Sequence, residues 1–405
     1  TKPIQIYNSY ETIDEPGEWY YDTNTDKLYL YPYEDTTADS KLYITQSRYD
    51  LISIRNAGYI SLEGITVTSS AKSGIVMDQV DSCVVNNCKA VNFLGMAISI
   101  DNANNSGVKN SDIAYTASTS VYVDGGDWET LTPGNNFISN NRIHDTNRNR
   151  TFNEGGIEIR GVAGTVDHNE FYNIPEQAMN FALAGDTETS VYTVIEYNVF
   201  HECNINGKDY SVIYAGRDAR CQGAVIRYNY FYNLGNSCTV YDMDAAAVYL
   251  DDGLSGATVT NNIFGPGSSS RMEAVRINNG HNNIVTNNLL IDVPSMFYAA
   301  IPDNFEERYL TENGFGLRWS SAAVLANELY RQTWPWIQKA YEGSRDFYIN
   351  NVISDNVLIY IDAKPNTVYS NSPENDNWFY AGGKNERVDD LDSNLVIFRD
   401  ANADN

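Results

Sequence analysis

A short pattern recurs along most of this sequence and restricts the chain to a repeat fold. Two or three alternating apolar residues precede an Asn, and two more apolar or aromatic residues follow it, as in FISNNRI, VIEYNVF and VIRYNYF. The Asn falls at Asn141, Asn169, Asn198, Asn229, Asn262 and Asn288, in steps of 28, 29, 31, 33 and 26 residues. Such spacing corresponds to one solenoid coil per repeat. The sequence therefore predicts an all-β fold, a single-stranded right-handed parallel β-helix of about ten coils.

The recurring Asn has a physical reason. The turn between two strands of a coil needs a residue that tolerates the left-handed conformation and forms local hydrogen bonds, so we expect the Asn to take that conformation. Stacked coil over coil, the side-chain amides are expected to form a ladder. Short strands of period two, such as Ile157–Arg160 and Val248–Asp251, would fill the rest of each coil.

The repeat is interrupted once, and this interruption defines the predicted organisation. The gap of 68 residues between Asn288 and Asn356 is too long for one coil, and residues 320–341 within it have helix formers at helical spacing, broken near Pro335. We predict a β-helix over residues 51–362, a helical insertion over about 296–345 and an irregular tail over 363–405. Residues 1–50 are predicted to pack on the solenoid, with an aromatic-rich hairpin in GEWYYDTNTDKLYLYP.

Composition excludes several classes of partner. The 53 acidic and 27 basic residues give a net charge of −26, which repels phosphate backbones, so nucleic acid is not an expected partner. We find no run of 18 apolar residues and expect no membrane span. The five cysteines and four histidines lack zinc-site spacing. We expect the cysteines to fill the core, and neither a disulfide scaffold nor a structural zinc site. Abundant Asn, Asp, Gly and Tyr with scarce Lys fit a secreted, extracellular protein.

Parity on one class of strand predicts a polar outer face. Where Ile157 and Ile159 point inward, Glu158 and Arg160 point outward. The same alternation turns further side chains outward on neighbouring coils: Ser99, Asp101, Tyr122, Asp124, Tyr249, Asp251, Arg276 and Asn278. Aromatic faces, planar donors and paired carboxylates are what a sugar-cleaving site needs. The alternative is that each outward acid is simply solvated.

Two segments stand out on this face. In YLDDGLSG, Asp251 and Asp252 meet a Gly-bounded turn, a pattern that could also bind calcium, although no cofactor or metal is required. One coil earlier, KDYSVIYAGRD begins its strand after Asp209 and ends it before Arg217. Stacked coils lie about 4.8 Å apart, so carboxylates from the two segments can approach each other. Because Asp209 precedes its strand, a sideways offset and an inverting reaction are slightly favoured over retention.

The ordered set of motifs GEWYYD, VYVDGGDWETL, VIEYNVF, IYAGRD, VYLDDGLSG and NNGHNNIVTNNLL resembles glycoside hydrolase family 141 over most of the chain. The resemblance implies a β-helix enzyme of the xylanase or α-L-fucosidase type, active on plant cell-wall glycans. It also implies two catalytic carboxylates, of which the first matches Asp209. The second matches Asp251 or Asp252, and parity favours Asp251. The family has further early coils, so a missing N-terminal segment or a second chain could complete the β-helix.

Three functions follow as hypotheses. The first is a glycoside hydrolase that uses Asp209 and Asp251 on a polysaccharide or oligosaccharide. Its cleft is expected to be lined by the substrate-binding residues Asp124, Glu158, Arg160, Arg217, Tyr249, Asp252 and Arg276. The second is a polysaccharide lyase on the same fold, with Arg160, Arg217 or Arg276 as base. The third is a non-catalytic glycan-binding solenoid. Tyr249 and Arg276 are expected to be exposed binding groups in the first.

Overall fold

The computed structural model describes residues 8–148 except 38, 41, 43 and 46, and then 155–182, 189–204, 210–235, 245–267, 272–293, 295–300, 323–342, 351–360, 378–381 and 396–397. The chain divides into two compact units, Thr1–Thr45 and Gln46–Asn405. Each is described here by itself.

The first unit contains the predicted hairpin. Strand β1 (Trp19–Asp22) pairs antiparallel with β2 (Lys27–Leu30), and a short 3-10 helix, η1 (Tyr10–Thr12), precedes them. The ring of Tyr10 lies edge-on against Tyr29, with ring centroids 5.0 Å apart. Tyr20 also lies against both rings, with centroids 6.0 Å from each, so three tyrosines pack together in this small unit. The hairpin is confirmed, and its packing on the solenoid stays a prediction.

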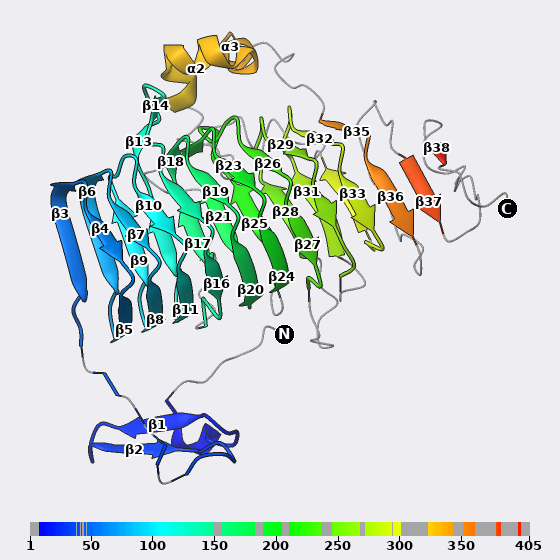
Figure 1. Cartoon of the computed structure of the whole chain (residues 1–405). Coiled ribbons are helices and arrows are strands. Elements are labelled where there is room, and N and C mark those ends of the chain that lie inside the picture. The colour runs from blue at the N-terminus through cyan, green and yellow to red at the C-terminus, as the bar shows by residue number, and fades with distance from the viewer. Residues whose placement is uncertain are drawn as a thin grey trace. The chain divides into compact units, whose positions relative to one another are not determined.

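The second unit is a solenoid of three parallel sheets (Figure 1). In the described part of the chain the first sheet has ten strands: β3 (Ile52–Gly58), β6 (Ile75–Asp81), β9 (Ile98–Asp101), β12 (Val121–Val123), β17 (Ile157–Ile159), β21 (Met179–Ala182), β25 (Tyr210–Gly216), β28 (Ala245–Asp251), β31 (Met272–Asn278) and β34 (Ser295–Ala300). The second, also with ten described strands, consists of β4 (Ser61–Glu63), β7 (Val84–Asn86), β10 (Gly107–Lys109), β15 (Phe137–Ser139), β19 (Thr165–Asp167), β23 (Val194–Glu196), β26 (Val225–Arg227), β29 (Thr258–Thr260), β32 (Ile284–Thr286) and β35 (Val352–Ser354).

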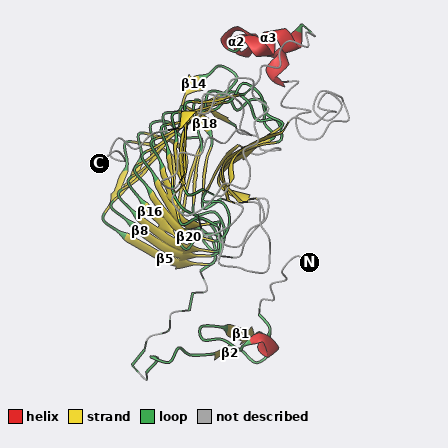
Figure 2. Cartoon of the chain, turned by 90° about the vertical axis from the view of Figure 1, so that its right-hand side faces the viewer, coloured by secondary structure: helices red, strands yellow, loops and turns green. Residues whose placement is uncertain are grey.

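The third sheet has twelve strands among the described residues: β5 (Thr66–Ser70), β8 (Lys89–Phe93), β11 (Asp112–Thr116), β16 (Arg142–His144), β20 (Glu170–Ile174), β24 (Val199–Cys203), β27 (Tyr230–Tyr232), β30 (Ile263–Phe264), β33 (Leu289–Ile291), β36 (Val357–Tyr360), β37 (Trp378–Ala381) and β38 (Val396–Ile397). Each coil passes through the three sheets in this order, and the strands stack into a column seen nearly end-on in Figure 2. The predicted parallel β-helix is confirmed, but β37 and β38 continue its third sheet within residues 363–405, which were predicted to be irregular.

Two short strand pairs form in the turns that follow the strands of the first sheet. Strands β13 (Gly126–Asp127) and β14 (Thr132–Pro133) form an antiparallel ribbon. Strands β18 (Gly161–Val162) and β22 (Ser190–Val191) pair in parallel. These turns are therefore ordered structure rather than plain connections.

Repetition also builds the interior. Equivalent residues of successive coils stack, as in the column of Phe171, Phe200, Phe231 and Phe264, whose neighbouring ring centroids lie 4.7, 4.9 and 5.0 Å apart. Burying one such ring contributes roughly 1.5–3 kcal/mol. The four described cysteines are free thiols in the core: Cys83, Cys88, Cys203 and Cys221. The prediction that cysteines fill the core is confirmed for these four, and Cys238 lies outside the described residues.

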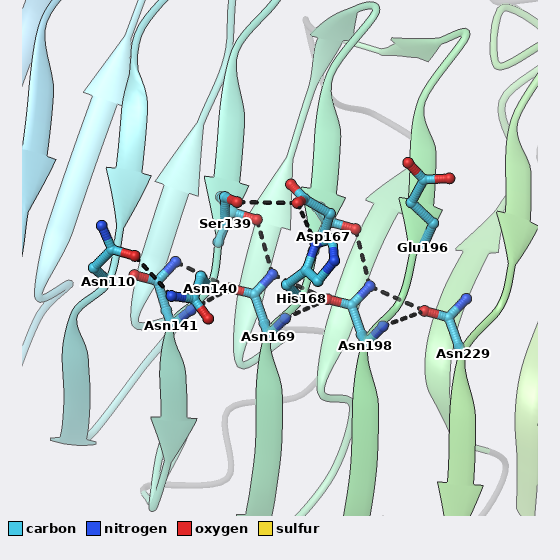
Figure 3. A network of polar contacts seen from close by, with 12 residues as sticks. Asn110, Ser139, Asn140, Asn141, Asp167, His168, Asn169, Glu196, Asn198 and Asn229 are labelled. Atoms are coloured by element: carbon cyan, nitrogen blue, oxygen red, sulfur yellow. Dashed lines mark hydrogen bonds and ion pairs between the residues drawn. The ribbon is translucent and has the colours of Figure 1, made fainter.

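The predicted Asn ladder runs between the second and third sheets (Figure 3). Each rung repeats the same bonds, as at Asn198: its Oδ1 accepts from the backbone and side-chain nitrogens of Asn169, at 2.9 and 3.0 Å. Its own side-chain nitrogen donates to the Asn229 side chain and to the Val166 carbonyl, at 3.0 and 2.9 Å. The ladder resumes across the 68-residue gap, because Asn288 donates to Asn356.

One detail of the prediction is wrong. The left-handed residue of this turn is the one before the ladder Asn: Asn140, His168, Tyr197, Tyr228, Asn261, Asn287 and Asp355, with φ between 53° and 56°. The ladder Asn must point its amide inward to reach the next coil, so its predecessor makes the turn. That residue points outward, and even Tyr or His is accepted there despite the cost of this conformation.

The predicted helical insertion over about 296–345 is confirmed in part: helices lie at 328–341, whereas residues 296–300 belong to strand β34 of the solenoid. Helix α2 (Glu328–Thr333) is followed by α3 (Pro335–Tyr341), with the break at the predicted proline. The side chain of Asn327 caps α2 by accepting from two backbone N–H groups, at 2.9 and 3.2 Å. The two helices lie at the edge of the solenoid near β14 (Figure 1). We call residues 323–342 the helical excursion.

Candidate functional site

The outer surface of the first sheet brings several predicted residues together. Register places Tyr214, Tyr249 and Arg276 side by side on β25, β28 and β31. Gly216 pairs with Asp251 two positions further along. Residues that parity turned outward therefore form columns across neighbouring coils.

The strands bend beneath this surface. In β31, Ala274 and Val275 are consecutive, and both point into the core. Strict alternation would have sent one of them outward, so the strand changes direction there. The bend brings outward residues three positions apart into contact, because Arg276 donates to both oxygens of Glu273, at 2.5 and 3.1 Å.

Asp251 ends β28, and three donors hold its carboxylate. The hydroxyl of Tyr214 donates to Oδ2 at 2.8 Å, the side chain of Asn278 donates to Oδ1 at 2.9 Å, and the backbone N–H of Asp252 donates to Oδ1 at 2.8 Å. Asp251 is only 6% exposed. Burial, and then the nearby Asp251 charge, raise the pKa of Tyr214 far above its usual range, so its hydroxyl stays protonated and donates.

Asp252 lies beside Asp251 and forms an ion pair. The Nε of Arg217 donates to its Oδ2 at 2.5 Å. Burial opposes the positive charge of Arg217, but attraction to Asp252, Tyr214 and Asp251, together with the hydrogen bond to Asp252, outweighs it and raises the pKa of Arg217. Arg217 and Asp252 both have left-handed backbones, with φ of 65° and 42°. Left-handed non-glycine residues recur at the turns of this solenoid, so this conformation marks the two residues as turn positions and does not by itself indicate function.

Tyr249 and Arg276 are less accessible than predicted, which corrects their assignment as exposed binding groups. Tyr249 is 4% exposed, and the Arg276 side chain is 12% exposed. The Tyr249 ring lies edge-on to Tyr214, with ring centroids 5.7 Å apart, and the Arg276 guanidinium carbon lies 5.2 Å from the Tyr249 centroid. Because Glu273 also holds Arg276, these groups pack with one another.

Three coils away, Glu158 and Arg160 form a second polar group. Arg160 donates to Glu158 at 3.0 Å and to the carbonyl of Asn180 at 2.8 Å. Arg160 is 2% exposed, so it is buried, although the alternation of the strand predicted that it would point outward into solvent. Asp124 is also buried, at 7% exposure, and accepts from the hydroxyl of Tyr122 at 3.1 Å.

Asp209 lies outside the described residues, and its distance from Asp251 stays a prediction. The backbone of the next residue, Tyr210, begins β25 and pairs with Ala245. Asp251 is at the other end of the same strand pair.

Some residues of the site were missed or undervalued in the sequence. Glu273 was not singled out, although its place three residues before Arg276 was a usable signal once the strand bend is known. Tyr214 was recognised only as part of a motif, and Asn278 only as an outward residue. Their shared bond to Asp251 depends on register between three coils, which parity within one strand does not specify.

Neither a metal site nor a membrane helix is found in the described part of the chain. No group of three or more His, Cys, Asp and Glu side chains among the described residues is arranged to hold an ion. No described helix is long and apolar enough to cross a membrane.

Comparison with known proteins identifies the fold family. Residues 50–264 match the model of the family described as "Right handed beta helix region". A search of curated proteins found no match.

Solved structures with detectable likeness include an alginate lyase from Paenibacillus sp. str. FPU-7, with 15% identity and a TM-score of 0.45 over 62% of this chain and 99% of that one. A mutant tailspike protein of E. coli bacteriophage HK620, in complex with a pentasaccharide, has 13% identity and a TM-score of 0.41 over 62% of this chain and 48% of that one. A structure described as a glycoside hydrolase has 13% identity and a TM-score of 0.41 over 80% and 61%. These values are too low to transfer an activity.

The family match, in contrast, spans more than half of the sequence and agrees with the three stacked parallel sheets, so the chain belongs to the right-handed β-helix family.

Proposed function

We propose that this protein is a secreted glycoside hydrolase acting on plant cell-wall polysaccharide, either xylan or a fucosylated pectic glycan. Asp251 is one catalytic carboxylate in this proposal, and Asp209 is its partner. Because Asp209 precedes the opposite end of the β25–β28 pair, the proposal requires the bend of these strands, at Val212–Ile213 and Ala247–Val248, to bring the two carboxyl groups together. The observation that carries the proposal is the environment of Asp251, a nearly buried carboxylate whose three hydrogen-bond donors are all neutral.

A buried carboxylate without a direct ion pair costs free energy, which a purely structural residue would avoid. Arg217 attracts Asp251 through space, but its guanidinium binds Asp252. Asp218 illustrates the structural alternative, because Arg220 binds it through two nitrogens and both residues are 1% exposed. No ion pair to Asp251 occurs among the described residues. The difference supports a chemical role for Asp251, in agreement with the resemblance to family 141, whose second acid matches Asp251 or Asp252.

The hydrogen bonds also suggest how Asp251 would act. Its oxygens accept from Tyr214, Asn278 and the Asp252 N–H, which fits a carboxylate that accepts a proton or attacks a sugar carbon. Asp209 would then protonate the leaving oxygen. A carboxyl separation of roughly 5–5.5 Å predicts retention of configuration, and roughly 6.5–9.5 Å predicts inversion. Proton NMR of the first anomer formed distinguishes the two, and we favour inversion.

The lyase alternative is weaker because each of its candidate bases is paired with a carboxylate. Arg160 binds Glu158, Arg217 binds Asp252 and Arg276 binds Glu273. Such pairing favours the charged guanidinium, which cannot remove a proton.

The test is an activity screen on xylans and fucosylated pectic glycans with the wild type and Asp251→Asn. We expect reducing ends or free fucose from the wild type, and a fall in kcat/KM of about 10²–10⁴-fold in the variant with little change in unfolding temperature. Glu63→Gln, an exposed acid on β4, is the matched control and should keep full activity.

Three results would contradict the proposal. Full activity in Asp251→Asn would remove this residue from the chemistry. Products with an unsaturated uronide would indicate a lyase. Glycan binding without turnover across the panel would indicate a binding solenoid.

A further inference from the structure

The helical excursion contacts the same turn that aims Arg217 at Asp252. The excursion packs on turns following the first sheet through an apolar cluster of Val162, Val191, Val324, Tyr330 and Ile337. Tyr330 is fully buried, and its hydroxyl donates to the backbone carbonyl of Arg220 at 3.1 Å. A residue 110 positions later in the chain thereby holds this turn.

The turn itself is rigid. The Arg220 guanidinium binds Asp218 through Nε and Nη2, both at 2.9 Å, and the Arg220 backbone N–H donates to the same carboxylate at 3.0 Å. Trp128 contacts both Arg220 and Tyr330: its ring centroid is 5.3 Å from the Arg220 guanidinium carbon and 5.9 Å from the centroid of the Tyr330 ring. A buried ion pair of this kind contributes little net stability but fixes geometry.

Arg217 directly precedes this locked turn. Its backbone is left-handed, its N–H donates to the Asp251 carbonyl at 3.3 Å, and its side chain binds Asp252. Asp252 in turn donates its N–H to the Asp251 side chain. Contacts therefore run without a break from Tyr330 through the Asp218–Arg220 turn to the proposed catalytic carboxylate.

We propose that Tyr330 is a positioning residue of the site: by holding the Arg220 carbonyl, it fixes the turn that directs Arg217 to Asp252 and so orients Asp251. This inference rests on the proposed function for its effect on catalysis, but the orientation of Arg217 can be measured without any substrate.

The experiment compares the full chain with its Tyr330→Phe variant, which removes one hydroxyl and keeps the ring. The matched control is Tyr192→Phe. Tyr192 packs on Trp334 of the same excursion, with centroids 5.5 Å apart, and among the described residues its hydroxyl has no hydrogen bond. The first readout is the ¹H–¹⁵N NMR resonance of the Arg217 Nε–H, assigned by its loss in Arg217→Lys. The second is steady-state kinetics with its pH profile.

We expect Tyr330→Phe to shift the Arg217 Nε–H resonance toward that of free arginine and to lower kcat about tenfold with KM nearly unchanged. Tyr192→Phe should match the wild type in both. An unshifted Arg217 resonance would overturn the inference, as would a lower unfolding temperature with unchanged kcat, or an effect confined to KM. If the wild type cleaves no glycan, the proposed function fails, and the NMR result still decides whether Tyr330 positions Arg217.

Discussion

Two stacks of polar side chains run along this β-helix, and they differ in how far they repeat. In the Asn ladder every rung is the same residue making the same bonds, as Asn169, Asn198 and Asn229 show. On the outer surface of the first sheet, the residue type at equivalent positions changes from coil to coil: Gly216 is followed by Asp251 and then by Asn278. Repetition satisfies buried polar groups uniformly, whereas a catalytic site needs different groups side by side. Stability is expected to depend on the first stack and chemistry on the second.

The largest expected effect is on the ladder. Asn198→Ala leaves Asn169 and the Val166 carbonyl without their partners, so we expect the free energy of unfolding to fall by about 3–5 kcal/mol. Urea unfolding followed by circular dichroism measures it. Asn104→Ala, at an exposed position, should change the free energy by no more than about 0.5 kcal/mol. Equal losses in the two variants would remove the distinction between ladder and surface amides.

The next effect concerns His281, which lies under the helical excursion with its ring 4.7 Å from that of Trp336. Burial lowers the pKa of His281 from 6.5 to about 4. Its neutral form stabilises the fold above pH 6.5, and this contribution, up to about 3 kcal/mol, is lost as pH falls toward 4, because the unfolded chain takes up the proton first. His281→Phe should flatten the fall of unfolding temperature over this range. An unchanged fall of unfolding temperature in His281→Phe would contradict this prediction.

A smaller effect tests the outer stack. If Asp251 is catalytic, Tyr214→Phe removes one of its three donors and should lower kcat about tenfold, with a loss in the free energy of unfolding of about 1–3 kcal/mol, smaller than in the ladder variant. Tyr122→Phe removes the similar bond to Asp124, a proposed substrate-binding residue, and should raise KM more than it lowers kcat. The same kinetic change in both variants would show that the two positions are not specialised.

The smallest effect comes from Asp101, also on the outer first sheet. Burial, and to a lesser extent repulsion from Asp124, raise the pKa of this carboxyl. A raised carboxyl pKa favours folding at low pH and costs stability once pH rises through it, so Asp101→Asn should raise the unfolding temperature slightly at pH 7 and not below about pH 4. Asp112 gives the opposite sign: burial opposes its charge, but hydrogen bonds from His144 and Lys89 lower its pKa. Asp112→Asn should therefore lower the unfolding temperature at pH 7.

Much of the fold could be predicted from the sequence because its signals are local and repeated. The positions of Asn141 through Asn288 predicted the ladder, and alternation around Ile157 and Ile159 predicted which side chains enter the core. The exposure of the site could not be predicted in this way. Arg160 and Tyr249 follow the outward parity and are nevertheless buried, because residues of neighbouring coils cover them.

The sequence by itself determined the coil length, the ladder, the break for the helical excursion and the candidacy of Asp251. Each is encoded within one coil, where the periods of strand and turn are written directly into the order of residues. The tertiary structure decided which groups meet: Tyr214 and Asn278 at Asp251, and Tyr330 at the Arg220 turn. These contacts join residues 27 to 110 positions apart. They depend on register between coils and on where the excursion packs, and neither is encoded in the local pattern of any single coil.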